Sequence, residues 1–183
     1  MADRQAQREK VIQALADHLL ANGLGQTSLR QLAAACDTSD RMLLYYFTDK
    51  TEIMTTVLGR VTEHFSVVLD QALPAQEMAP HDLLLKATAL IRTPAMRPTM
   101  RLWLDMVAAA AREEPPFPAI AKSLLHQLMH WIEVRLEGPS GDAKRQRAAF
   151  LLAVIDGIAM FDMKGGVAEA DAAEAALTNI AML

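Results

Sequence analysis

The stretch that decides the fold runs from residue 25 to residue 50 and reads GQTSLRQLAAACDTSDRMLLYYFTDK. Thr27 and Ser28 can accept hydrogen bonds from the free N–H groups at the start of a short helix. A second short helix follows Thr38 and Ser39, which supply the same kind of cap. Between the helices stands Asp37, a residue that tolerates left-handed backbone dihedrals better than most. The stretch therefore predicts two short helices joined by a tight turn.

This arrangement is typical of a helix-turn-helix, whose second helix enters the major groove of DNA. Ala33 is the small residue that lets the two helices cross, and Leu32 and Leu43 are the apolar anchors. The second helix is expected over residues 39–46. Its N-terminal end would bring N–H groups and a positive dipole close to phosphate, while its exposed side chains face base edges.

Outward from this stretch, apolar residues recur at helical spacing, and no convincing alternation typical of strands is present. The predicted fold class is all-α. We expect a first helix over 4–21, a long hinge helix over 50–73, and a linker over 74–80 that contains two prolines. Breaks at proline and glycine separate five further helices, expected at 81–93, 98–113, 117–137, 143–163 and 169–182. The predicted domains are a helix-turn-helix domain over 1–50, followed by the hinge helix, and a second helical domain over 74–183.

The composition excludes several classes of protein. The chain has 183 residues and a single cysteine, Cys36, so neither a disulfide scaffold nor a zinc-finger array is expected. The N-terminus lacks the pattern of a secretory signal, and no window of about 18 uncharged apolar residues is available to span a membrane, so a cytoplasmic location is expected. The formal charge of −4 argues against nucleic acid as a partner. However, residues 1–60 carry seven basic and seven acidic side chains, so the negative charge belongs to residues 61–183.

Residues 8–60 resemble the N-terminal domain of TetR-type transcriptional regulators. The match is carried by Gly25, Thr27, Leu32-Ala33, Asp37-Thr38-Ser39, Leu43-Leu44-Tyr45-Tyr46-Phe47 and Lys50. A weaker likeness is Val154-Ile155-Asp156-Gly157-Ile158, which is similar to a segment of the family's penultimate long helix. The sequence departs from the family's pattern at Asp37, in place of the turn glycine. It also departs at Leu44, where the family commonly has a tyrosine that approaches phosphate.

The resemblance implies a DNA-binding surface on and around the second short helix. Tyr45 and Tyr46 would contact phosphates or thymine methyl groups, and Lys50 the backbone. Arg30 would reach a base, since a bidentate contact between arginine and guanine is the commonest specific contact in the major groove. The full set of predicted DNA-binding residues is Thr27, Ser28, Arg30, Ser39, Asp40, Arg41, Tyr45, Tyr46 and Lys50.

By the same resemblance, the second half is expected to bind a small molecule and to form a homodimer. The dimer interface is predicted on the last two helices, at Phe150, Leu151, Val154, Ile155, Ile158, Leu177 and Ile180, with the core of a monomer as the alternative. An apolar pocket beside the hinge helix would be lined by Met100, Trp103, Met106, Phe117, Leu125, Met129 and Phe161, residues that ordinary core packing would also explain. Arg101 and Asp105 are interpreted as a solvated helix face.

Nothing in the sequence indicates an enzyme, a cofactor or a bound metal. His126 and His130 share a helix face at metal-ligand spacing, but no third ligand accompanies them. We expect a homodimeric repressor that reads a palindrome with two recognition helices about 34–36 Å apart and that a small apolar or amphipathic effector releases from DNA. Two alternatives remain. One is a helical interaction protein without specific DNA binding, favoured by Asp37, Asp40 and Leu44, and the other is a metal-dependent enzyme that uses the two histidines.

Overall fold

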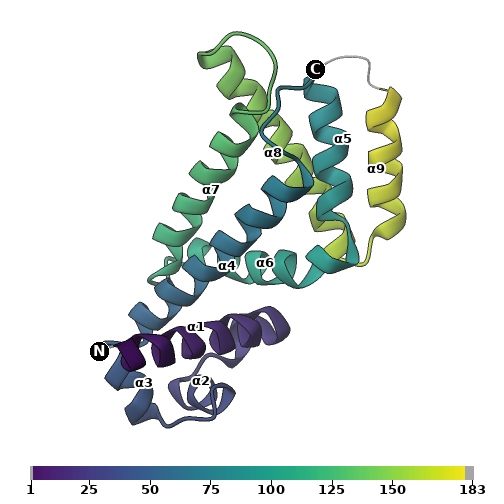
Figure 1. The fold of residues 1–183 in the computed structure, drawn as a ribbon. Coiled ribbons are helices and arrows are strands. Elements are labelled where there is room, and N and C mark those ends of the chain that lie inside the picture. The colour runs from purple at the N-terminus through teal and green to yellow at the C-terminus, as the bar shows by residue number, and fades with distance from the viewer. Residues whose placement is uncertain (1, 180–183) are drawn as a thin grey trace. The chain divides into compact units, whose positions relative to one another are not determined.

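A computed structural model describes residues 2–179 of the chain. No β-strand occurs among these residues, and the only extended pairing there is an isolated bridge between Met78 and Leu136. The all-α prediction is therefore confirmed. No helix in this range is long and apolar enough to cross a membrane. The elements are α1 (Ala2–Asn22), η1 (Gly23–Gln26), α2 (Leu29–Ala35), α3 (Asp40–Tyr46), α4 (Lys50–Ala72), α5 (Pro80–Ile91), η2 (Pro94–Met96), α6 (Arg97–Ala111), α7 (Phe117–Glu133), α8 (Asp142–Met163) and α9 (Val167–Asn179) (Figure 1).

The described chain forms two compact units that are not contiguous in sequence. The first contains residues 2–67 and 101–122, and the second contains residues 68–100 and 123–179. Helices α4, α6 and α7 each run from one unit into the other. The sequence placed a single boundary near residue 74 and did not anticipate that residues 101–122 pack with the N-terminal helices.

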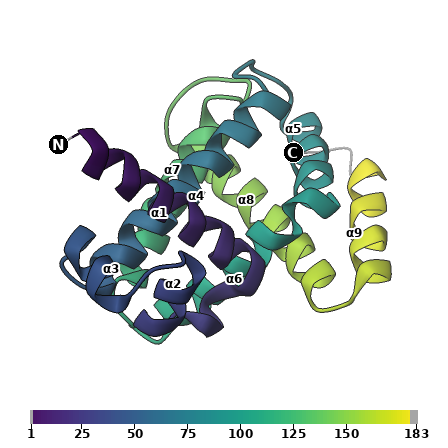
Figure 2. The ribbon, with the colours of Figure 1, turned by 60° about the horizontal axis from the view of Figure 1, so that its bottom comes forward.

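The first unit buries the apolar face of α1 against the two short helices and the start of α4. Helix α1 packs beside α2, and α2 packs beside α3 (Figure 2). The largest buried side chains come from all four helices: Ile12, Leu15 and Leu19 from α1, Leu32 from α2, Leu43 from α3, and Ile53 and Met54 from α4. Leu32 and Leu43 are the two anchors that the sequence predicted.

The second unit has a core in which α5, α8 and α9 pack together. The buried cluster includes Leu83 and Leu84 of α5, Leu151, Ile155 and Ile158 of α8, and Leu177 of α9. Four residues predicted at the dimer interface, Leu151, Ile155, Ile158 and Leu177, are thus buried in the chain's own core, because the apolar positions of α8 face in two directions. Ile180, a fifth, lies outside the described residues.

Helix α7 ends earlier than the predicted 137, at Glu133. The next residues pair instead with the linker: the Met78 N–H donates to the Arg135 carbonyl at 2.8 Å, and the Glu137 N–H donates to the Met78 carbonyl at 3.0 Å. The Arg135 side chain, only 2% exposed, donates from Nε to the Leu73 carbonyl at 2.8 Å and from Nη2 to Asp70 at 2.7 Å. These contacts tie the end of α4 to the end of α7 within the second unit.

Candidate nucleic-acid interface

The first short helix begins at a complete capping box. The Ser28 hydroxyl accepts a hydrogen bond from the Gln31 N–H at 3.3 Å, and the Gln31 side chain accepts one from the Ser28 N–H at 3.0 Å. Ser28 therefore caps α2, as predicted. Thr27, just outside the helix, donates its hydroxyl to the Leu24 carbonyl at 3.0 Å. Arg30 lies exposed on α2 and makes no ion pair within residues 2–179.

The turn and the second short helix follow the predicted geometry closely. Asp37 has a φ of 49°, the left-handed conformation that the turn requires. The Thr38 N–H donates back to the Ala33 carbonyl at 3.0 Å, which closes the turn on α2. Ser39 then caps α3 by accepting from the Met42 N–H at 3.3 Å. The helix expected over residues 39–46 is therefore α3, with Ser39 as its cap.

The faces of α3 divide cleanly between core and solvent. Leu43 is buried, and so is Phe47 immediately after the helix. Tyr46 is half-buried and lies edge-on against Tyr45, with ring centroids 5.3 Å apart. The exposed residues of the helix are Asp40, Arg41, Met42, Leu44 and Tyr45. Three of the five were predicted DNA contacts, and Met42 and Leu44 were not.

Two arginines of α1, absent from the sequence prediction, hold the C-terminal end of α3. Arg4 donates from Nη2 to the Tyr45 carbonyl at 3.0 Å, and its guanidinium lies 4.5 Å from the centre of the Tyr45 ring. Arg8 donates from Nε to the Tyr46 carbonyl at 3.4 Å and lies 4.8 Å from the centre of the Phe47 ring. Cations at a helix C-terminus neutralise its free carbonyls and its negative dipole end. We call these contacts the arginine clamp of α3.

The clamp continues into the start of α4. Arg8 Nη2 lies 3.4 Å from Glu52, whose carboxylate accepts from the Thr48 N–H at 2.6 Å. The hydrogen bond from Thr48, assisted by Arg8, lowers the pKa of Glu52 below its ordinary value. Asp49 accepts from the Glu52 N–H at 2.8 Å, so Asp49 caps α4. Lys50, the first residue of α4, is exposed.

Arg101 and Asp105 of α6, interpreted from the sequence as a solvated helix face, bind the backbone at and just after the end of α1. Arg101 donates from Nη2 to the carbonyls of Leu20 and Ala21, at 2.8 Å and 2.6 Å. Asp105 accepts from the Leu24 N–H at 2.9 Å. Gly23 has a φ of +68°, and a Cβ placed on it would lie 2.3 Å from the Asp105 carboxylate. The close approach of α6 to η1 therefore requires a glycine at position 23.

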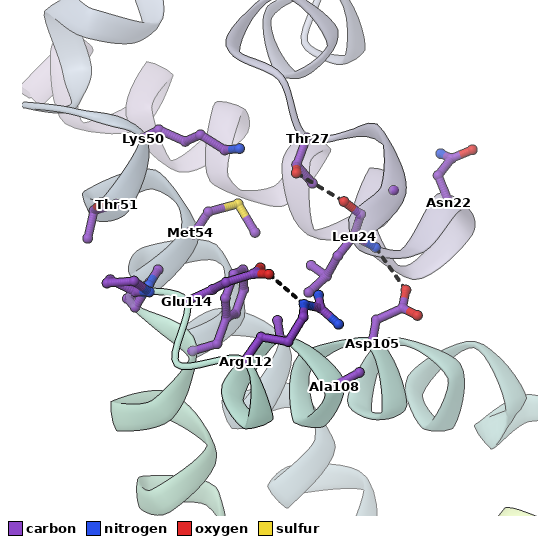
Figure 3. A pocket seen from close by; sticks show the side chains of 15 residues that line it. Asn22, Leu24, Thr27, Lys50, Thr51, Met54, Asp105, Ala108, Arg112 and Glu114 are labelled. Atoms are coloured by element: carbon purple, nitrogen blue, oxygen red, sulfur yellow. Dashed lines mark hydrogen bonds and ion pairs between the residues drawn. The ribbon is translucent and has the colours of Figure 1, made fainter.

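A cavity of about 600 Å³ lies beside this contact, within the first unit. Leu24 and Thr27 line one side, Lys50 and Met54 of α4 another, and residues 105–117 of α6 and the following loop a third (Figure 3). Figure 3 shows Lys50 extending from α4 toward Thr27. Arg112 and Glu114, on the opposite side, pair with each other at 2.5 Å. Two predicted DNA contacts, Thr27 and Lys50, thus border a space of the size that small ligands occupy.

The seven residues predicted to line an apolar pocket lie in different places. Phe117 lines the cavity just described, and Met100 lines a smaller one of about 190 Å³ in the second unit. Met106 is buried in the first unit, and Met129 packs against the core of the second. Leu125 and Phe161 are 49% and 43% exposed, and Trp103 is half-buried. A common pocket for the set stays a prediction.

The predicted dimer interface retains an exposed part on α8. Phe150 is 50% exposed, and Met160 and Phe161 are also exposed, while Val154 is half-buried. Phe150, Val154 and Phe161 follow one another at intervals of four and seven residues, so they share one side of α8. We call them the outer face of α8. Of the seven predicted interface residues, Phe150 and Val154 belong to it.

The histidines and the cysteine that the sequence singled out lie in different surroundings. His126 and His130 are both exposed, and no group of three or more metal-ligating side chains is assembled among residues 2–179. Burial raises the pKa of the Cys36 thiol to about 11, which keeps it protonated and unreactive at neutral pH. Cys36 lies against the Val11 carbonyl, with Sγ 3.8 Å from the oxygen.

The fold therefore combines an N-terminal helix-turn-helix with an all-helical second unit, and solved structures of the same architecture exist. A transcriptional regulator from Rhodococcus sp. Rha1 matches with a TM-score of 0.73 and 24% identity, over 93% of this chain and 91% of that one. A TetR-family regulator from a Rhodococcus species matches with a TM-score of 0.72 and 16% identity, over 97% and 95%. The multidrug binding protein EbrR, complexed with proflavin, matches with a TM-score of 0.70 and 20% identity, over 94% and 98%. No protein-family model and no curated protein sequence matches the chain. The fold is that of the TetR-type transcriptional regulators.

Proposed function

We propose that this protein is a TetR-type transcriptional regulator that binds a specific DNA sequence through α3. The observation that carries the proposal is the geometry of the helix-turn-helix. Ser39 caps α3, Asp37 adopts the left-handed turn, and the outward side chains of α3, from Asp40 to Tyr45 except Leu43, are exposed. This is the arrangement in which a recognition helix enters the major groove.

The distribution of charge supports the same conclusion despite the acidic composition. Arg30, Arg41 and Lys50 are exposed and make no ion pair among the described residues. They come from α2, α3 and the start of α4, the three elements nearest to a duplex bound along α3. Arg4, which stacks on Tyr45, adds a fourth cation at the end of α3. Such local focusing of cations allows a nearly neutral domain to bind phosphate, most strongly when two copies act together.

A second copy of the chain would dock on the outer face of α8. Aromatic side chains that are exposed on one side of a helix are typical of an interface between subunits. A two-fold dimer has two copies of α3, which would read a palindromic operator whose half-sites are about 34–36 Å apart.

The repressor activity that we propose depends on a small molecule. A ligand in the 600 Å³ cavity would contact Lys50 and Thr27, two residues proposed to bind the DNA backbone, so ligand and DNA would compete. The pocket predicted from the sequence remains the alternative site. Proflavin, the molecule complexed with EbrR, is the probe that separates the two sites. Ala108→Trp fills the cavity with an indole, so the rise in Tm that proflavin should cause in the wild-type protein should disappear in this variant. A rise that persists would locate the ligand elsewhere.

Selection from a randomised duplex library tests the function directly. Full-length protein should enrich a two-fold symmetric sequence at about 150 mM salt, and fluorescence anisotropy should show binding at least a thousandfold tighter than to a scrambled duplex. Arg41→Ala should lose most of this preference. Weak binding that is indifferent to sequence would instead favour a helical interaction protein with the same fold.

Sedimentation velocity tests the proposed dimer. Phe150→Glu places a charge on the outer face of α8 and should give a monomer without unfolding the chain, because half of the side chain is already in water. Val67→Glu, at an equally exposed valine of α4, is the matched control and should remain dimeric. If both variants sediment alike, the dimer forms through another surface.

A further inference from the structure

The outward side of α3 is unusually apolar for a surface that would face DNA. Met42 is 39% exposed, Leu44 is 48% exposed and Tyr45 is 54% exposed, although the helix has only seven residues. Leu44 follows Arg41 by three positions, and Tyr45 follows it by four, so the three side chains adjoin one another on the surface. The core is already served by Leu43 and Phe47, which are fully buried. The packing of the domain therefore does not require Leu44.

Chemistry restricts what Leu44 can do against a duplex. Its side chain has no donor or acceptor, so it can hydrogen-bond neither to phosphate nor to a base edge. On the major-groove edges of the four bases, the one apolar group is the C5 methyl of thymine. A leucine pressed against any other edge would desolvate polar atoms without replacing their hydrogen bonds. Its complementary partner in the groove is therefore a thymine methyl group.

The arginine clamp fixes the position from which Leu44 would make this contact. The carbonyls of Tyr45 and Tyr46, the two residues after Leu44, are both held by arginines of α1. The last turn of α3 is thereby held against α1. Because the backbone there is fixed, the short side chain of Leu44 has little freedom to move away from a base that it contacts. Met42 lies nearer the start of the helix, and its flexible thioether can adapt to a second methyl group.

We propose that Leu44, assisted by Met42, selects thymine in the operator through its 5-methyl group. This inference rests on the proposed function, since it concerns how the same helix distinguishes one base from another. The burial of one methyl group corresponds to about a fourfold change in affinity. A symmetric operator with one such contact in each half-site would lose about fifteenfold when both methyl groups are removed.

Deoxyuridine supplies the test, because it pairs as thymine does and lacks only the methyl group. The probe is the duplex selected by the wild-type protein, synthesised with deoxyuridine at one symmetric pair of thymines at a time. At one pair or more, the Kd of the wild-type protein should rise about fifteenfold. For Leu44→Ala, thymine and deoxyuridine at that pair should give equal affinity. Val67→Ala, at an equally exposed apolar residue of α4, should keep the full difference.

Each outcome of this experiment has a distinct meaning. A selected sequence without thymine in its half-sites, or deoxyuridine duplexes that all bind like the parent, overturns the inference and leaves the proposed function intact. A methyl dependence that is undiminished in Leu44→Ala also overturns it. If selection yields no preferred sequence, the proposed function itself fails, and the inference fails with it.

Discussion

The arginine clamp of α3 leads to a prediction that links stability to DNA binding. Arg8→Met keeps the apolar stem of the side chain and removes its charge. The substitution removes three interactions: the bond to the Tyr46 carbonyl at 3.4 Å, the ion pair with Glu52 at 3.4 Å, and the stacking on the Phe47 ring at 4.8 Å. Lys10→Met is the matched control, because Lys10 is an exposed cation of the same helix without an ion pair in the described chain.

The size of the effect follows from the geometry of the three interactions. The carbonyl bond is long and contributes about 0.5 kcal/mol, the low end for such bonds. The ion pair, with Glu52 38% exposed, is screened by water and adds about 0.3 kcal/mol. The cation above the Phe47 ring adds about 0.7 kcal/mol. A decrease of about 1.5 kcal/mol in the free energy of unfolding should lower Tm by about 3 to 6 °C in a chain of this length.

Two measurements check this reasoning. Thermal unfolding followed by circular dichroism should show the lower Tm for Arg8→Met and almost no change for Lys10→Met. Anisotropy with the selected duplex should show weaker binding by Arg8→Met than by Lys10→Met. The loss should be at most about tenfold for each half-site, because loss of the clamp in one subunit removes about 1.5 kcal/mol. Equal Tm values and equal affinities for the two variants would refute the clamp.

Three further predictions concern DNA contacts, the second unit and pH. Lys50→Ala should weaken binding to all sequences and reduce the slope of log Kd against log salt by about 0.9 for each phosphate that the lysine neutralises. Arg30→Ala should instead relax specificity at one base pair by about 1–3 kcal/mol. Identical behaviour of the two variants in salt titrations would contradict these separate roles. Arg135→Met should destabilise the protein by about 3 kcal/mol in urea unfolding, because the buried Leu73 carbonyl and the partly buried Trp131 carbonyl both lose a charged donor. An unchanged midpoint would show that water replaces the donor. Burial raises the pKa of Asp156 from 3.8 to about 6, so its contribution to stability is fully present below pH 4 and is lost as pH rises through 6. Asp156→Asn should remove that part of the pH dependence of the free energy of unfolding, measured between pH 4 and 7. If the curves of the variant and the wild-type protein run parallel over this range, the prediction is wrong.

Local features of the helix-turn-helix were predictable because they depend on neighbouring residues. Ser28 and Ser39 cap helices through bonds to residues three positions away, and Asp37 occupies a turn defined by the chain on either side. Buried Leu32 and Leu43 follow from the same short-range spacing. The helical period likewise identified all the long helices, with differences mainly at their ends.

The features that the sequence did not reveal depend on contacts between distant segments. Arg4 binds a carbonyl 41 positions away, and Arg101 binds one 81 positions away, and neither contact leaves a periodic pattern. Helix α7 stops at Glu133 because residues 135–137 pair with Met78, which periodicity cannot show. On α8, apolar residues occupy two sides of the helix, so spacing alone did not distinguish the buried Ile155 from the exposed Phe150.

The ratio of two dissociation constants decides whether α3 reads a DNA sequence. Fluorescence anisotropy at about 150 mM salt should compare the selected duplex with a scrambled duplex of the same length and base composition, each titrated with full-length protein. We expect a ratio of at least about a thousand, the range that specific DNA-binding proteins reach. A ratio below about ten, with both duplexes bound only weakly, would contradict the conclusion that α3 reads a DNA sequence.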